Sequence, residues 1–186
     1  MKTILIAGSK GGSSKSTLSL CLAACLAQNY SVCLIDTDPQ GTLQSFKDLI
    51  KIDLVDLASI KQSDYNVSII DSPPYLSNQL PELIKLADYV LLPCRPNAFD
   101  AVALKTIISL IKNKPCGIVL TQVQHRVNIT DVLDVLQGYN IPILKQTMSH
   151  RVSYARAAFQ NLFDSDDIKA QKEILSITIE ILSQIK

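Results

Sequence analysis

The amino-acid sequence predicts an α/β fold with three layers, in which a mostly parallel sheet carries helices on both of its faces. Short apolar runs rich in Val, Ile and Leu recur along the chain, as is typical of strands that are buried on both faces. Segments with helical periodicity separate these runs, and strands that alternate with helices pair in parallel through crossovers. A glycine-rich segment also joins the first apolar run to the first helical segment.

The predicted strands are the apolar runs at residues 3–7, 32–36, 67–71, 89–93 and 117–122, with a further candidate at residues 143–146. Between and after them, apolar residues recur at steps of three and four, as in helices with one buried side. The predicted helices cover residues 15–28, 78–87, 101–112, 130–136, 153–159 and 168–185.

The last predicted helix carries an apolar stripe that includes Ile174, Ile177 and Ile181. Such a stripe can lie on a membrane surface or pack against the sheet. The polar side of the helix mixes glutamates with lysines instead of being strongly basic, which favours packing against the sheet. We therefore expect no membrane partner.

Length and composition indicate a single domain that covers residues 1–186. A chain of 186 residues with 47% hydrophobic residues can bury one sizeable core, and no repeat, linker or low-complexity tract divides it. The formal net charge is only +1, so the molecule as a whole does not attract nucleic acid. Any contact with DNA would need a local basic patch.

The five cysteines are expected to be reduced and buried, because they lie mostly in apolar runs and lack CxxC spacing. Cys21 and Cys25 stand one helical turn apart, but their apolar neighbours favour core packing over metal binding. The first apolar run is too short for a signal peptide, and no segment approaches a membrane-spanning length. The expected compartment is the cytoplasm.

The glycine-rich segment has the chemistry of a site for ATP and Mg²⁺. Backbone amides at the start of a helix suit the clustered negative charge of a triphosphate, and Gly11 and Gly12 allow the backbone to approach it closely. Lys15 would bring a positive charge to the β- and γ-phosphates, and Ser16 would offer a hydroxyl to Mg²⁺. Thr17 can bond the α-phosphate.

Ser14 departs from the general phosphate-loop pattern, which has a glycine immediately before the lysine. A serine costs backbone freedom at this position and can tilt the loop. A glycine-rich turn that holds no nucleotide is therefore the alternative to a phosphate site.

Lys10 makes the segment more specific, since it stands five positions before Lys15 and is followed by two glycines. The pattern Lys-Gly-Gly-x-x-Lys-Ser-Thr resembles the deviant Walker A loop of the ParA/MinD ATPases, which implies a P-loop NTPase fold. In that family the early lysine reaches across a nucleotide-sandwich dimer to the partner's phosphates, which implies a homodimer and the same catalytic role for Lys10. The resemblance implies that ATP contacts Lys10, Gly11, Gly12, Ser13, Ser14, Lys15, Ser16 and Thr17.

A second motif, Asp-Thr-Asp-Pro-Gln at residues 36–40, follows the second predicted strand and resembles the family's Asp-x-Asp-Pro-Gln segment. The resemblance implies that Asp38 positions the attacking water and that Asp36 supports the water shell of the metal. A carboxylate beside the γ-phosphate is also what the reaction needs, because phosphoryl transfer depends on positioning and charge stabilisation. On spacing alone, a solvated acidic turn is the alternative.

A third motif, Asp-Ser-Pro-Pro at residues 71–74, ends the third predicted strand and resembles the Walker B segment with the family's Asp-x-Pro-Pro. The resemblance implies that Asp71 holds Mg²⁺ through water. Ligands of open parallel sheets gather at the carboxyl ends of the strands, where Asp36 and the glycine-rich loop are also expected.

The resemblance continues through residues 91–100, which are similar to the family's switch-like Pro-x-x-Pro segment, and through residues 151–157. Thr121 is the candidate for the adenine contact, although relatives usually use Asn there. The candidate DNA-binding residues, which resemble the family's basic residues near the C-terminus, are Arg151, Arg156 and Lys169. Their contacts with DNA phosphates should weaken as the salt concentration rises. The alternative is that they are ordinary surface charges.

Two features depart from the family pattern. Residues 56–64 are too few for the helix that relatives usually place before Walker B, and no helix-turn-helix extension precedes Met1. We therefore expect a trimmed member that does not bind a specific operator sequence.

Small members of this kind resemble the ParA-type ATPases that segregate plasmids or chromosomes. Their ATP-bound dimers coat the DNA of the nucleoid without sequence preference, and a small centromere-binding partner of the ParB or ParG type stimulates hydrolysis and releases them. This is the expected function. The alternatives are a MinD-like positioning ATPase, a dethiobiotin-synthetase-like ligase and a scaffold that does not hydrolyse ATP, which liposome binding and turnover assays would separate.

Overall fold

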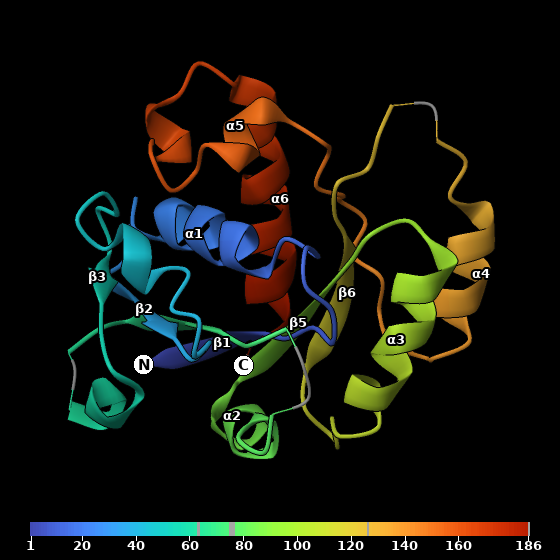
Figure 1. Ribbon diagram of the computed structural model, residues 1–186, viewed down its shortest axis with the longest axis horizontal. Coiled ribbons are helices and arrows are strands. Elements are labelled where there is room, and N and C mark those ends of the chain that lie inside the picture. Colours follow the sequence, from blue (N-terminus) through green and yellow to red (C-terminus); the bar gives the residue numbers. More distant parts are fainter. Residues whose placement is uncertain (63, 75–76, 126, 186) are drawn as a thin grey trace.

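The computed structural model describes residues 1–62, 64–74, 77–125 and 127–185. Within these residues, six parallel strands form one sheet in the order β3-β2-β4-β1-β5-β6 (Figure 1). The fold is therefore the predicted α/β fold with a parallel sheet. The strands are β1 (Lys2–Ile6), β2 (Val32–Asp36), β3 (Asp53–Leu54), β4 (Val67–Asp71), β5 (Tyr89–Cys94) and β6 (Cys116–Leu120).

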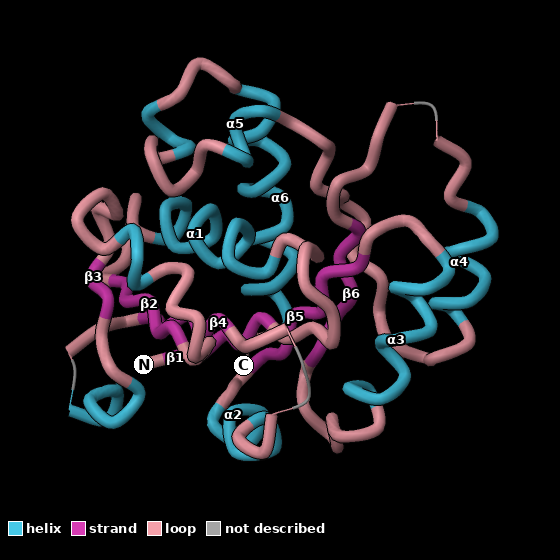
Figure 2. Tube along the Cα trace, viewed as in Figure 1, coloured by secondary structure: helices cyan, strands magenta, loops and turns pink. Residues whose placement is uncertain are grey.

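Helices cover both faces of the sheet and complete the three predicted layers (Figure 2). The core on one face packs the sheet against α1 (Lys15–Leu26) and α6 (Ile168–Gln184), with α5 (Val152–Ala155) beside them. The core on the opposite face packs the sheet against α2 (Leu80–Leu86), α3 (Ala98–Ile108) and α4 (Thr130–Gln137). All of these helices overlap the ranges predicted from periodicity.

The helix α1 is buried on nearly every side instead of along one stripe. Its buried residues run without interruption from Leu18 to Leu26. The sheet lies beneath the helix, and α5, α6 and the 3-10 helix η3 (Leu162–Asp164) contact it from other directions. The start of α1, which follows the glycine-rich loop, is consequently held in a fixed place above the sheet.

The helix α6 packs against the sheet, as predicted. Ile174, Ile177 and Ile181 on its apolar stripe are all fully buried, in the same core as residues of β1 and β5. In the described part of the chain, every helix is too short or too polar to pass through a lipid bilayer.

The predicted strand at residues 143–146 is wrong, because only single bridges form there. Ile143 pairs with Ile118 of β6 in one isolated bridge. Beyond Leu144, the backbone amides of Lys145 and Gln146 donate to the Glu180 carboxylate of α6 at 2.9 and 3.0 Å. A side chain from the covering helix thus takes the hydrogen bonds that a continued strand would need.

The segment between β2 and β4 contains short elements that the apolar pattern does not predict. They are the two-residue strand β3 and the 3-10 helices η1 (Gln44–Phe46) and η2 (Leu57–Gln62). The predicted helix at residues 153–159 is likewise reduced to the four residues of α5, followed by turns. The stretch that is too short for a full helix before β4 therefore holds the 3-10 helix η2.

The cysteines are free and buried, as predicted. Burial raises the pKa of Cys21 to about 12, with Cys25 adding to the rise, so this thiol stays protonated at neutral pH. Neither Cys21 nor Cys25 belongs, within the described residues, to a group of three or more His, Cys, Asp or Glu side chains that could hold a metal. Both are packing residues of α1.

Candidate functional site

The candidate site lies at the carboxyl edge of the sheet, where β1, β2 and β4 end together. Their registers pair Ile6 of β1 with Asp71 of β4, and Asp36 of β2 with the same Asp71. The glycine-rich loop leaves β1 at this edge and enters α1. The strand register therefore brings two of the predicted metal carboxylates side by side beneath the loop.

The loop has the backbone shape of a phosphate cradle. Gly12 and Ser14 adopt positive φ angles of 75° and 69°, so the chain turns twice before α1 begins at Lys15. The Lys15 ammonium folds back and donates to the Lys10 carbonyl at 3.1 Å. Backbone amides at the start of a helix, together with a lysine arched over them, are suited to binding phosphate.

Ser14 occupies the left-handed conformation that glycine normally provides at this position. Its φ of 69° and ψ of 22° cost a non-glycine residue about 1–2 kcal/mol. Ser14 therefore carries the backbone cost that the sequence predicts. The serine nevertheless keeps the loop geometry, and its hydroxyl lies 2.8 Å from the side-chain nitrogen of Gln122.

Lys15 is buried, with 7% of its surface exposed. Burial lowers the pKa of its ammonium, whereas the nearby Asp71 and Asp38 carboxylates act in the opposite direction. Both acids therefore lie close enough to Lys15 to influence its charge. The predicted residues Lys15, Asp38 and Asp71 are thus brought together by the fold.

Asp71 is the most buried acid of the site, with 1% of its surface exposed. Its Oδ1 accepts a hydrogen bond from the Ser19 hydroxyl at 3.3 Å, whereas its Oδ2 receives none from the described residues. Burial raises the pKa of Asp71 to about 7, the Ser16 hydroxyl opposes that rise, and Asp36 adds to it. A buried carboxylate oxygen without a donor, near a serine hydroxyl, fits a hydrated Mg²⁺ ion.

Asp36 is tied to the backbone of the loop that follows β2. Its Oδ1 accepts from the Asp38 amide at 3.0 Å, and its Oδ2 accepts from the amides of Leu43 and Gln44 at 2.8 and 3.2 Å. Both oxygens therefore hold this loop in shape. Asp36 positions Asp38 directly, and its support of the metal's water shell stays a prediction.

Asp38 stands in a tight turn beside the phosphate loop. One carboxylate oxygen accepts from the Gln40 amide at 3.0 Å, and the Asp38 carbonyl accepts from Gly41, whose φ is 60°. The preceding Thr37 donates from both its amide and its hydroxyl to the Asp71 carbonyl, at 3.0 and 2.8 Å. These bonds fasten the Asp38 turn to the end of β4.

Lys10 points away from its own loop and toward α3. Its ammonium lies 3.5 Å from Asp100 Oδ1 and 5.6 Å from the centre of the Phe99 ring, which is 80% exposed. Arg95 forms a two-bond pair with the same carboxylate, at 2.6 and 3.2 Å. Burial alone would raise the pKa of Asp100, but Arg95 and Lys10 outweigh it and hold that pKa below its usual value.

A cavity of about 210 Å³ opens beside the phosphate loop. It adjoins the start of α1 and has a size that suits part of a small ligand. The cavity is lined by Ser14, Thr17, Gln122, Met148, Ser149, His150, Arg151, Tyr154 and Ala155.

Thr121, the predicted adenine contact, does not line this cavity. It is fully buried, and its hydroxyl donates to the Ser13 carbonyl at 3.2 Å, so it supports the loop from below. The lining residues Gln122 and His150 were missed because neither belongs to a motif. The lining residues from Met148 to His150 also carry no apolar or charge pattern that would mark them.

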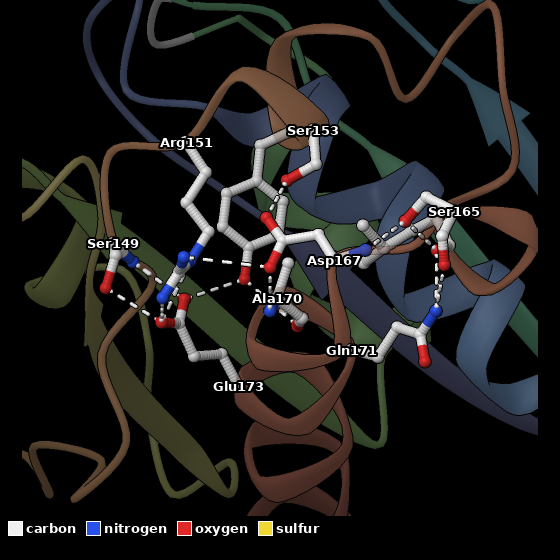
Figure 3. Close-up of polar contacts among 10 residues, drawn as sticks. Ser149, Arg151, Ser153, Ser165, Asp167, Ala170, Gln171 and Glu173 are labelled. Atoms are coloured by element: carbon white, nitrogen blue, oxygen red, sulfur yellow. Dashed lines mark hydrogen bonds and ion pairs between the residues drawn. The ribbon is translucent and has the colours of Figure 1, made fainter.

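Arg151 is held in an ion-pair network at the start of α6 (Figure 3). Its guanidinium donates to Glu173 at 2.7 and 3.1 Å and lies 3.7 Å from Asp167. The Ser149 amide and hydroxyl, together with the Tyr154 hydroxyl, also contact the Glu173 carboxylate, at 2.8–3.0 Å. Arg151 is therefore neutralised in place and joins α6 to the wall of the cavity.

Arg156 and Lys169, the other predicted DNA-binding residues, are exposed near α5 and at the start of α6. The segment around η1 lies beside them, because the Phe46 ring meets the Phe159 ring edge-on at 5.4 Å. An ion pair of 3.0 Å between Lys51 and Asp164 joins the same two parts of the chain. The fold thus gathers these exposed cations around one corner of the molecule, while Arg151 is turned inward.

A family model described as the CobQ/CobB/MinD/ParA nucleotide binding domain matches residues 4–163. The "Maintenance of carboxysome distribution protein A" of Halothiobacillus neapolitanus is 26% identical over 183 residues, covering 86% of this chain and 85% of that protein. "Protein ParA" of Rhizobium radiobacter is 28% identical over 164 residues, covering 80% and 72%.

Solved structures share the fold. The ATP complex of Cyanothece McdA superimposes with a TM-score of 0.83 at 18% identity, covering 100% of this chain and 97% of that one. At 18% identity, this structural similarity shows a shared fold only.

Proposed function

The chain belongs to the CobQ/CobB/MinD/ParA family of nucleotide-binding domains, and from that premise we propose that it is a Mg²⁺-dependent ATPase of the ParA type. In this proposal ATP joins two copies into a dimer, the dimer binds DNA without sequence preference, and hydrolysis releases it. The observation that carries the proposal is the meeting of Lys15, Asp38 and Asp71 beneath the left-handed turns of the phosphate loop.

The residues present fit Mg²⁺ as part of the site. Ser16 and Asp71 would hold the hydrated ion, in keeping with the preference of Mg²⁺ for one or two protein oxygens together with phosphates and water. When bound, the ion neutralises charge on the β- and γ-phosphates. Lys15 would add a second positive charge beside the same phosphates.

Asp38 is the residue that would orient the attacking water. Its turn is fixed twice, once by the Asp36 carboxylate and once through Thr37 to the end of β4. A carboxylate held so firmly keeps its oxygens at a constant distance from the loop, which is what orientation of a nucleophile requires. Asp36 therefore contributes to turnover by positioning Asp38.

Lys10 and Phe99 support the proposed dimer. The lysine has 40% of its side chain exposed and reaches outward from the phosphate loop, beside an aromatic ring that is 80% exposed. A second copy laid over this face would cover the ring and would bring its own phosphates within reach of Lys10. Burial of an exposed aromatic ring is a common source of interface stability.

Arg156 and Lys169, with Lys47 from the neighbouring segment, are proposed to contact DNA phosphates. All three are exposed, and the Phe46–Phe159 contact brings their two segments together. Arg151 is proposed to support this corner from within instead of touching DNA, because two acids already pair with it.

The cargo would be a DNA molecule or another large body that a nucleoid-bound gradient can move. One relative bears a name for carboxysome distribution, which supports a role in positioning a cargo. A small partner protein that binds a centromere-like site would stimulate hydrolysis. The burial of the apolar stripe of α6 favours this function over a membrane-bound, MinD-like one.

The experiment is sedimentation of the chain with DNA in the presence of Mg²⁺ and ATP, ADP or no nucleotide. We expect binding with ATP alone, with a steep loss as salt rises. The double variant Arg156→Ala/Lys169→Ala should lose DNA and keep ATP. A matched control, Lys105→Ala/Lys112→Ala, removes the same charge from exposed positions near α3. Equal DNA binding with ADP and ATP, or no binding at all, would refute the proposal.

A further inference from the structure

Two consecutive residues that directly follow β6, Thr121 and Gln122, form hydrogen bonds with the phosphate loop. The Thr121 hydroxyl donates to the Ser13 carbonyl at 3.2 Å. The Gln122 side-chain nitrogen donates at 2.8 Å to both the Gly12 carbonyl and the Ser14 hydroxyl. Three successive residues of the loop are thereby held by residues more than a hundred positions away in the sequence.

These contacts set the direction of the loop amides. In a planar trans peptide the carbonyl oxygen and the next amide hydrogen point in opposite directions. Because the Gly12 and Ser13 carbonyls face the end of β6, the amides of Ser13 and Ser14 must face the other way. Those amides are the groups that a phosphate would contact in such a loop.

Gln122 also contacts Ser14, which stands where the general phosphate-loop pattern has a glycine. Ser14 has a φ of 69°, and Gln122 itself has a φ of 54°, so both residues hold a conformation that side chains disfavour. Such strain persists only where the surroundings enforce it. The paired hydrogen bonds of the Gln122 carboxamide supply that enforcement for Ser14.

We infer that Gln122 is a positioning residue of the nucleotide site: it holds Ser14 in the left-handed turn and thereby aims the loop amides at the phosphates. The inference rests on the proposed function, since it concerns binding of Mg-ATP. Gln122 also lines the cavity beside the loop, together with Thr17 and His150. A ligand group in that cavity would therefore touch the residue that sets the loop.

The test uses Gln122→Ala, which keeps the Cβ and hence the same backbone preference but removes both donated bonds. Two lost neutral hydrogen bonds should weaken Mg-ATP binding by about 10-fold. Adding Ser14→Gly should restore most of that loss, because glycine adopts the turn without help. Gln124→Ala is the matched control from the exposed surface two residues along, and it should change nothing.

A second readout needs no nucleotide. In ¹H–¹⁵N spectra of the free protein, Gln122→Ala should shift and broaden the amides of Ser13 and Ser14, and Ser14→Gly should sharpen the loop signals again. Thermal melting checks that each variant is folded. This readout stands even if the native chain binds no ATP, in which case the proposed function alone would fail.

Two results would overturn the inference. One is a Gln122→Ala variant whose loop amides and Mg-ATP affinity match those of the native chain. The other is an affinity loss that Ser14→Gly leaves unchanged, because the side chain would then act on the nucleotide directly and not through Ser14.

Discussion

Asp38 lies in a turn that hydrogen bonds of Asp36 and Thr37 hold at the edge of the sheet. Asp38→Ala should leave ATP binding in place, because the phosphates are held by the loop and Lys15. Loss of the positioned carboxylate should slow hydrolysis by about 10²-fold or more. Phosphate release and a nucleotide titration on the same sample measure the two effects.

Asp48→Ala is the control for that experiment, since it removes an exposed acid from the segment beyond the turn. It should hydrolyse ATP at the native rate. If the Asp38→Ala variant hydrolysed ATP at the native rate, Asp38 would have no role in the reaction. The motif would then be an ordinary solvated acidic turn.

Sequence motifs predict the candidate site residues themselves, but not the residues that hold them in place. Short motifs with fixed spacings predict Lys15 and Asp71 as site residues. Gln122 could not, because its contacts with Gly12 and Ser14 join positions that only the fold brings together. The sequence predicts Arg151 as a DNA contact because it does not show that Glu173 and Asp167 lie against the guanidinium.

At the scale of elements, Glu173 of α6 fastens the segment after β6. Its carboxylate accepts from Ser149, Arg151 and Tyr154. Burial alone would raise the pKa of Glu173, but these hydrogen bonds outweigh it and hold the pKa below its usual value. A carboxyl group of this kind stabilises the fold above its unfolded pKa and loses that contribution as the pH falls through its folded pKa.

Glu173→Gln should therefore lower the free energy of unfolding at pH 7 by about 1–3 kcal/mol, because a neutral amide replaces the charged acceptor. The gap between variant and native chain should narrow as the pH falls below the ordinary glutamate pKa of 4.5, and it should close only below the lowered pKa of the folded Glu173. Thermal melting from pH 7 to pH 3 measures it. Glu82→Gln, at an exposed pair with Lys85, should melt like the native chain. A gap that stays constant with pH would contradict the assignment.

Five of the six strands in the described residues could be predicted because burial on both faces makes each of them a continuous apolar run. They are β1, β2, β4, β5 and β6. Residues 143–146 resemble a strand in sequence, but the amides of Lys145 and Gln146 donate to Glu180 instead of to β6. The strand β3 spans only two residues, too few to leave a pattern.

At the scale of the whole molecule, Lys10 is proposed to act on a second copy of the chain. In the single chain it is paired with Asp100 and rests over Phe99. Lys10→Ala in the Asp38→Ala background should still bind ATP but should not form the dimer, because the cation that reaches the partner's phosphates is gone. Sedimentation velocity with Mg-ATP measures this, with Asp38→Ala alone as the dimeric reference. A dimer that forms equally without Lys10 would contradict the proposed role.

The central claim is that the loop between β1 and α1 binds Mg-ATP through its amides and Lys15, and calorimetric titration tests it most directly. We predict one ATP bound per chain in the presence of Mg²⁺, with the heat lost in Lys15→Ala and kept in Lys105→Ala. A folded native chain that releases no heat with Mg-ATP, or a Lys15→Ala variant that binds as tightly as the native chain, would contradict the claim.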